Sequence, residues 1–171
     1  ANLVRRALTA QNLAIDEASC ASALADFLRL YSAGSAKLTT IFDGAIDALD
    51  RLPCGGFCLG ICTNKPLAPT KIVLDQFGLT RFFDTIVGGD QLASRKPDPA
   101  MLFHAMACLG TTSCLFVGDS EIDRETAAAA GQPFALFTKG YRTSSIEILN
   151  PEYYFNEYSE LTNIVNLNIR N

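Results

Sequence analysis

The sequence lacks the features that direct a protein to nucleic acid or to a membrane. It has no basic excess: 14 Lys and Arg stand against 18 Asp and Glu, with a formal net charge of −4 and a pI of about 4.9. Nucleic-acid binding requires clustered Lys and Arg, so this balance argues against nucleic acid as the main partner. No apolar run approaches the ~18 residues of a membrane span, and no secretory signal is visible at the start. We therefore expect neither a nucleic-acid nor a membrane partner.

Paired metal-binding cysteines are also absent. The six cysteines form no Cys-x-x-Cys pair, and no histidine lies near Cys54, Cys58 and Cys62. Zinc ligands usually come as two closely spaced pairs, so this spacing does not favour zinc. We expect buried free thiols that pack as small hydrophobic side chains, with Cys20 and Cys108 in the core of helical segments. Free thiols are typical of a reducing compartment, most simply the cytoplasm.

The chain is long enough for one α/β domain with a small appendage. It has 171 residues, of which 49% are hydrophobic. The first 33 residues carry helical spacing and no strand pattern, so residues 1–36 are expected to form a helical appendage. Over residues 37–171, short apolar strands alternate with helices, which is typical of parallel βαβ units with helices on both faces of the sheet. The expected strands cover residues 57–62, 82–87, 114–117, 134–137 and 153–155.

The most informative stretch runs from residue 113 to residue 131. Residues 114–117 are apolar, which predicts a strand buried on both faces, and Asp119 and Asp123 follow it at the start of an Ala-rich helix. Ligands of open α/β sheets bind at the carboxyl ends of the strands. Mg²⁺ usually takes one or two carboxylates, so these two residues form a candidate Mg²⁺ site. Helix capping by Asp119 and Ser120 is the alternative explanation.

Two further strand ends carry groups suited to a phosphate. Thr63 and Asn64 follow a predicted strand at a helix start, where a hydroxyl, an amide and free backbone N–H groups can bind an anion. Lys96 precedes a helix opened by proline, and its ammonium can neutralise a phosphate and a nearby carboxylate. Taken singly, these residues are explained as helix caps and a solvated lysine. Their order along the chain, ending at Asp119, favours a single phosphate site.

In this order the motifs resemble those of the haloacid dehalogenase superfamily of phosphatases. Thr-Asn-Lys-Pro at 63–66 resembles its second motif, which binds the substrate phosphate through Thr63 and Asn64. Lys-Pro-Asp-Pro at 96–99 resembles the third, whose catalytic lysine steadies the nucleophile and the phosphate. Gly-Asp-Ser at 118–120, with Asp123, resembles the fourth motif, the acidic Mg²⁺ site.

Two flanking motifs look most like those of the phosphoglycolate phosphatases within this superfamily: Gly-Gly-Asp at 88–90 and Gly-Tyr at 140–141. The resemblance implies a Rossmann-like core and a small phosphorylated substrate. It also implies Mg²⁺ bound by Asp119, with Asp123 as a direct ligand or one sphere further out. Residues 1–36 would be part of the helical cap that lies over the active site and selects the substrate.

The superfamily's first motif, Asp-x-Asp-Gly after an apolar strand, does not occur in this sequence. Its first Asp is the nucleophile that becomes an aspartyl phosphate, and its second is the general acid and base. The nearest match puts Ile41, which has no nucleophilic atom, at the nucleophile position, and Asp43 is explained as a helix cap. We expect the natural protein to begin some tens of residues earlier, with the missing strand between those ending at Cys62 and Val117. The missing part is then cleaved, disordered or supplied by another chain. The 171-residue chain alone is then expected to be inactive.

Three functions are compatible with these motifs. The favoured one is a Mg²⁺-dependent phosphomonoester hydrolase acting on 2-phosphoglycolate. The second is another phosphatase, or a phosphomutase, of the same superfamily. The third is a non-catalytic fragment or interaction module that kept the fold. His104, the single histidine, lies in a helical segment and is expected at the helix surface or packed rather than in catalysis. The sequence does not specify an oligomeric state.

Overall fold

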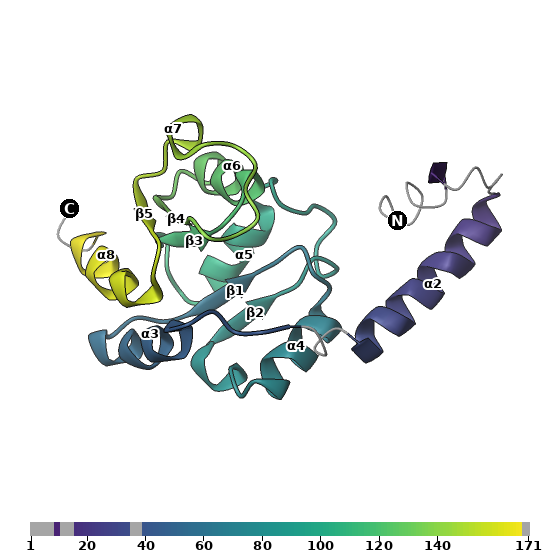
Figure 1. Ribbon diagram of the computed structural model, residues 1–171, viewed down its shortest axis with the longest axis horizontal. Helices are drawn as coiled ribbons and strands as arrows, with labels where there is room; N and C mark the ends of the chain where they lie inside the picture. The colour runs from purple at the N-terminus through teal and green to yellow at the C-terminus, as the bar shows by residue number, and fades with distance from the viewer. Residues whose placement is uncertain (1–8, 11–15, 35–38, 169–171) are drawn as a thin grey trace. The chain divides into compact units, whose positions relative to one another are not determined.

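The computed structural model describes residues 9–10, 16–34 and 39–168, and the chain divides into two compact units, Ala1–Thr39 and Thr40–Asn171. In the first unit, α2 (Glu17–Gly34) ends where the sequence predicts (Figure 1). Asp16 Oδ1 accepts a hydrogen bond of 2.7 Å from the Ser19 backbone N–H, which satisfies one of the free amides at the helix start. The helical spacing predicted over residues 3–8 lies outside the described residues. The assignment of residues 1–36 to a cap stays a prediction.

The second unit alternates helices with strands, which confirms the predicted α/β class. Its helices are α3 (Ala45–Arg51), α4 (Leu67–Gln76), α5 (Ala100–Cys108), α6 (Glu121–Ala129), α7 (Ile146–Leu149) and α8 (Leu161–Asn168). Its strands are β1 (Gly60–Cys62), β2 (Thr85–Val87), β3 (Phe116–Gly118), β4 (Phe134–Phe137) and β5 (Tyr153–Phe155). Single 3₁₀ turns cover Pro53–Gly55, Thr80–Phe82 and Tyr158–Glu160.

All strand pairs in the described residues are parallel, but they form two sheets. β1 pairs with β2, and β3, β4 and β5 form a separate sheet in that order. Within the described part of the chain, β1 and β3 are not hydrogen-bonded to each other. The break lies where the sequence analysis puts the strand of the missing motif.

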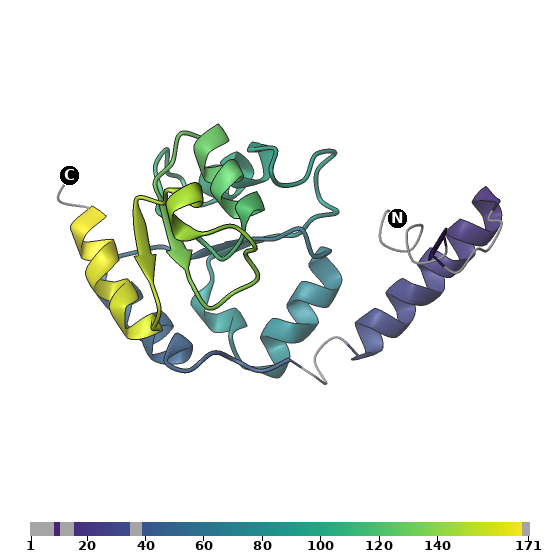
Figure 2. The same ribbon diagram turned by 45° about the horizontal axis from the view of Figure 1, so that its top comes forward.

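Helices cover both faces of the three-stranded sheet (Figure 2). All four residues of β4 are buried, and they alternate between two clusters. Phe134 and Leu136 pack with residues of α5 and α6, whereas Ala135 and Phe137 pack with residues of α8 and with Phe155 of β5. Alternate burial on two sides is what a parallel strand between two helical layers requires.

Helix α5 connects the two sheets. Its Met101 and Ala105 pack with Val87 of β2, and its Leu102 and Met106 belong to the cluster around Phe116 and Phe134. One helix therefore contributes to the cores of both sheets. This arrangement keeps the strand ends of both sheets within one structural unit.

The strands predicted over 134–137 and 153–155 are confirmed as β4 and β5, whereas the first three strands are shorter than predicted and one of them is less buried. The strands expected over 57–62 and 82–87 reduce to three residues each, because the ladder between β1 and β2 covers three residue pairs. The prediction that the third strand is buried on both faces is wrong at Val117, which is 37% exposed. Leu115 packs against the cluster under α8, but that layer does not extend to the carboxyl end of β3.

Helix α3 corrects the explanation given for Asp43. The N-cap residue is Gly44, with a φ of 76° and no capping side chain, and Asp43 is exposed. A left-handed φ at the residue before a helix favours glycine, which has no Cβ to clash with the backbone. The predicted aspartate cap is therefore wrong. The N-cap is the next residue, Gly44, and no side chain caps the helix.

The cysteine prediction is wrong for half of the thiols. Cys20 is buried as expected, and Cys62 and Cys114 are half-buried, but Cys54, Cys58 and Cys108 are exposed. Cys108 lies on the outward side of α5, where its Sγ is 3.9 Å from Nε2 of His104. His104 is itself exposed on the helix surface, as the sequence predicts.

None of the helices in the described residues combines the length and the apolar character that crossing a bilayer would require.

Candidate active site

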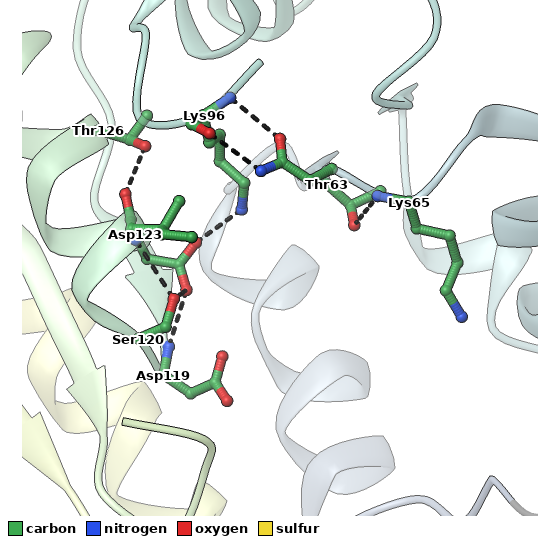
Figure 3. A network of polar contacts seen from close by, with 9 residues as sticks. Thr63, Lys65, Lys96, Asp119, Ser120, Asp123 and Thr126 are labelled. Carbon is green, nitrogen blue, oxygen red and sulfur yellow. Dashed lines mark hydrogen bonds and ion pairs between the residues drawn. The ribbon is translucent and has the colours of Figure 1, made fainter. Parts of the chain in front are cut away.

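Three loops meet at the carboxyl ends of the strands (Figure 3). Thr63 and Asn64 follow β1, Lys96 lies between β2 and α5, and Asp119 follows β3 directly. Hydrogen bonds connect Asn64 to Lys96, Lys96 to Asp123, and Asp123 back to the backbone of Asp119. The structure therefore brings the residues of the three motifs into one polar network, as their order along the chain predicts.

An ion pair lies at the centre of this network. Lys96 Nζ is 2.6 Å from Asp123 Oδ1, and the two side chains are only 11% and 9% exposed. The ammonium also lies 5.5 Å from the centre of the Phe116 ring. A lysine this far from solvent requires a charged partner, which Asp123 provides. Lys96 is thus a fixed positive charge and not a solvated one.

The surroundings of Asp123 keep its carboxylate ionised. Burial acts to raise the pKa of Asp123, but the Lys96 ammonium, its hydrogen bond, and hydrogen bonds from the Ser120 hydroxyl and the Asp119 N–H together give a net lowering. Oδ2 accepts from Ser120 Oγ at 2.7 Å and from the Asp119 N–H at 3.2 Å, while Oδ1 faces Lys96. Both oxygens of Asp123 are therefore engaged within the protein.

Glycine at position 118 makes this close packing feasible. A Cβ on Gly118 would lie 2.4 Å from the Cβ of Asp123, which is closer than two side chains can approach. Ser120 then caps α6, since its Oγ accepts from the Asp123 backbone N–H at 3.4 Å. The predicted capping role thus falls to Ser120 alone, and the Asp119 side chain is left for another contact.

Asn64 connects the first loop to the second. Its Nδ2 donates to the Lys96 carbonyl and its Oδ1 accepts from the Lys96 N–H, both at 3.0 Å. Thr63 Oγ1 accepts from the Lys65 N–H at 3.2 Å, which leaves the hydroxyl hydrogen of Thr63 able to donate to a ligand. Asn64 therefore fixes the backbone that carries the lysine, and retains one N–H of its own.

We expect Asn64→Ala to destabilise the fold by about 1–2 kcal/mol, because it removes both hydrogen bonds to the Lys96 peptide. Urea unfolding followed by circular dichroism measures the change. Asn166→Ala, at an exposed position of α8, is the control and should stay within about 0.5 kcal/mol of the unsubstituted chain. Equal midpoints for Asn64→Ala and the unsubstituted chain would contradict the role assigned to Asn64.

The Asp119 carboxylate has a partner that the sequence did not indicate. Its Oδ2 accepts a hydrogen bond of 2.8 Å from the backbone N–H of Tyr141, which lies 22 residues further along the chain. Glu121, two residues later, accepts from the N–H groups of Thr143 and Ser144 in the same loop. These backbone donors lower the pKa of Glu121 to about 2. Backbone donors have no residue signature, so the residue types at positions 141, 143 and 144 do not reveal these contacts.

The donor set fits a magnesium ion that relies on further ligands. In residues 9–10, 16–34 and 39–168, no three His, Cys, Asp or Glu side chains gather as a metal site. Asp119 offers one carboxylate, and the oxygens of Asp123 are both engaged. Mg²⁺ commonly takes one or two carboxylates and completes its shell with water and substrate phosphate. The residues present are compatible with such an ion at Asp119.

Two neighbouring groups are neutral at ordinary pH. Burial raises the pKa of the Cys62 thiol to about 11, with Lys96 lowering and Asp123 raising it by smaller amounts. Burial also raises the pKa of Tyr158, and the Asp119 carboxylate adds to the effect. A thiol that stays protonated is a poor nucleophile. Cys62, although at the end of β1, is therefore not suited to covalent catalysis.

Comparison with known proteins gives a consistent result. Residues 6–137 match the haloacid dehalogenase-like hydrolases. A phosphoglycolate phosphatase of Cereibacter sphaeroides (strain ATCC 17029 / ATH 2.4.9) is 42% identical over 95% of this chain and 75% of its own length. A phosphoglycolate phosphatase of Rhodospirillum rubrum is 36% identical over 93% of this chain and 68% of its own length. The crystal structure of a predicted phosphoglycolate phosphatase from Haemophilus somnus 129PT superposes with a TM-score of 0.85 at 26% identity, covering 94% of this chain and 73% of that one.

Proposed function

Because the chain belongs to the haloacid dehalogenase-like hydrolases and comes from a phosphatase of that family, we propose that the protein hydrolyses 2-phosphoglycolate to glycolate and phosphate with Mg²⁺. The observation that carries this proposal is the buried Lys96 ammonium, fixed by Asp123 between the loops of Thr63 and Asp119. A fixed positive charge at the carboxyl ends of parallel strands suits a small doubly charged ester.

The side chains of the first two loops take the phosphate. Lys96 has three N–H donors and uses one for Asp123, so two remain to donate to phosphate oxygens. The Thr63 hydroxyl donates to a third oxygen, and Asn64 holds the Lys96 backbone and adds its remaining N–H. Lys96 is the catalytic residue of this set, since its charge offsets the negative charge that develops as the ester bond breaks.

Asp119 is proposed as the direct ligand of Mg²⁺, and Asp123 as a residue one sphere further out. The engagement of both Asp123 oxygens supports this division. When bound, the ion supplies positive charge against the phosphate oxygens. Asp123 keeps Lys96 in place and accepts a hydrogen bond from the Asp119 N–H. It therefore fixes the distance between the Lys96 ammonium and the Asp119 residue.

The nucleophile is proposed to lie upstream of this chain, as the first Asp of an Asp-x-Asp-Gly motif. Its carboxylate attacks phosphorus, the bond from phosphorus to the glycolate oxygen breaks, and the second Asp protonates the leaving oxygen. Water then hydrolyses the aspartyl phosphate. The neutral Cys62 thiol supports an external nucleophile, since a protonated thiol is a poor one. Residues 1–36 are proposed as part of the cap, and the free cysteines support a cytoplasmic location.

The test is phosphate release by the protein extended at its N-terminus with the residues that precede this chain in its gene. We expect hydrolysis of 2-phosphoglycolate that requires Mg²⁺, stops with EDTA, and falls about 100-fold or more in Asp119→Asn. Glu125→Gln, exposed on the outside of α6, is the matched control and should retain full activity. A higher kcat/KM for another phosphomonoester, transfer of phosphate within one substrate, or hydrolysis without Mg²⁺ would each contradict the proposal.

A further inference from the structure

The loop that follows β4 is attached to the candidate active site by two carboxylates. Asp119 accepts from the Tyr141 backbone N–H, and Glu121 accepts from the backbone N–H groups of Thr143 and Ser144. We name residues 140–144 the anchored loop. The chain just before it is fixed separately, because the Thr138 N–H donates to the Phe155 carbonyl at 3.0 Å. Within the part of the chain that the structure describes, the hydrogen bonds between the anchored loop and the start of α6 are those that these two carboxylates accept.

Glu121 makes the larger share of these contacts. Its Oε1 accepts from the Thr143 N–H at 2.8 Å, from the Thr143 hydroxyl at 3.0 Å and from the Ser144 N–H at 2.6 Å. An acidic residue in the first turn of a helix needs none of these contacts to stabilise the helix. Three donors on one oxygen instead fix the position of two consecutive residues of the loop relative to α6.

The loop backbone lies directly against Asp119. A Cβ on Gly140 would be 2.2 Å from Asp119 Oδ2, so only glycine fits at this approach. The next residue, Tyr141, then donates its N–H to the same oxygen at 2.8 Å, while its ring is 87% exposed. The contribution of Tyr141 to the site is therefore its amide and not its side chain. A hydrogen bond to one oxygen of a metal-binding carboxylate fixes the direction of the other.

We infer that Glu121 is a positioning residue: it holds the anchored loop so that the Tyr141 N–H orients the Asp119 carboxylate toward the bound cation. The inference rests on the proposed function for the role of Asp119 as a cation ligand. The connection from Glu121 through the loop to Tyr141 is independent of the proposed function, because hydrogen bonds in the structure give it directly. Glu121 itself needs no contact with the cation or with the substrate.

The test compares Glu121→Ala with Glu121→Gln, which keeps an oxygen acceptor for the loop. Glu125→Ala, exposed one turn further along α6, is the control. Hydrogen exchange of the Tyr141 amide is the first readout. We expect exchange at Tyr141 to rise about 10-fold or more in Glu121→Ala and to stay near the original rate in the other two variants. A structural role confined to the loop would accelerate exchange at Thr143 and Ser144 only, and that result would overturn the inference.

Cation affinity is the second readout, measured by Mn²⁺ broadening of amide signals near Asp119 with Mg²⁺ as competitor. Loss of an outer residue that orients a metal ligand typically lowers affinity 10- to 100-fold. We expect about 10-fold weaker binding in Glu121→Ala and near-original binding in Glu121→Gln. Equal affinities in Glu121→Ala and the original chain would overturn the inference. If the original chain binds no cation, the proposed metal site fails, and exchange at Tyr141 still decides whether Glu121 fixes the Asp119 contact.

Discussion

The 171-residue chain alone is expected to release no phosphate from 2-phosphoglycolate, with or without Mg²⁺. In the proposed function the groups that meet at the strand ends bind and neutralise the phosphate, and the carboxylates among them are assigned other roles, Asp119 to Mg²⁺ and Asp123 to Lys96. Lys96 is paired with Asp123, Cys62 is protonated at neutral pH, and the sequence contains no Asp-x-Asp-Gly. Loss of nucleophilic catalysis lowers the rate of hydrolysis by orders of magnitude.

A coupled phosphate assay at high protein concentration measures this prediction. Lys96→Met provides the background, because any contaminating phosphatase would be unaffected by it. Release above that background, dependent on Mg²⁺, would mean that a residue of this chain serves as nucleophile and would overturn the assignment of that role to an upstream Asp. The same assay on the extended protein separates an inactive chain from an inactive preparation.

Replacing Lys96 by Met is expected to destabilise the fold by about 3–5 kcal/mol, because it leaves the Asp123 carboxylate buried without its cation. The two side chains are almost inaccessible, so water cannot substitute for the ammonium. Thermal and urea unfolding measure the loss. Lys139→Met is the matched control: it breaks the ion pair between Lys139 and Glu157, whose side chains are about half exposed. Such a surface pair contributes at most about 1 kcal/mol.

Two further measurements test whether the loss comes from the unpaired charge. Adding Asp123→Asn to Lys96→Met should recover part of the stability, since no buried charge remains. Acid should also reduce the difference between Lys96→Met and the original chain. The pKa of Asp123 is lowered in the folded state, so its contribution is present above the unfolded value of about 3.9 and is lost as pH falls through the folded pKa. A loss that is the same at pH 3 and pH 7 would contradict this explanation.

The sequence predicts where the motif residues lie better than it predicts the details of the fold. Thr63, Lys96 and Asp119 each stand at a strand end or a helix start, and parallel strands bring such positions to the same edge. The lengths of the first three strands were harder to predict, because a ladder ends where its partner ends and not where the apolar residues do. The exposure of Val117 and Cys108 likewise depends on how far a neighbouring layer extends.

Contacts made by the backbone were beyond the reach of sequence reasoning. The amide of Tyr141 is available in any residue but proline, so nothing at position 141 indicates that its N–H meets Asp119. An acid at position 121, in the first turn of a helix, is as compatible with a plain helix acid as with a role beside the metal site, and its three donors lie 22 and 23 residues away. Gly140 was the available signal, since a glycine after a buried strand is compatible with a close backbone approach.

The separation of the two sheets has a consequence for handling the protein. Among the described residues, β1 is paired only with β2 and β3 only with β4, so each offers a row of backbone groups to any extended segment that reaches it. Such rows are templates for aggregation when no charged side chain, proline or covering element protects them. Whatever segment comes to lie along β1 and β3 would therefore determine how concentrated a solution of this chain can become before its molecules begin to join.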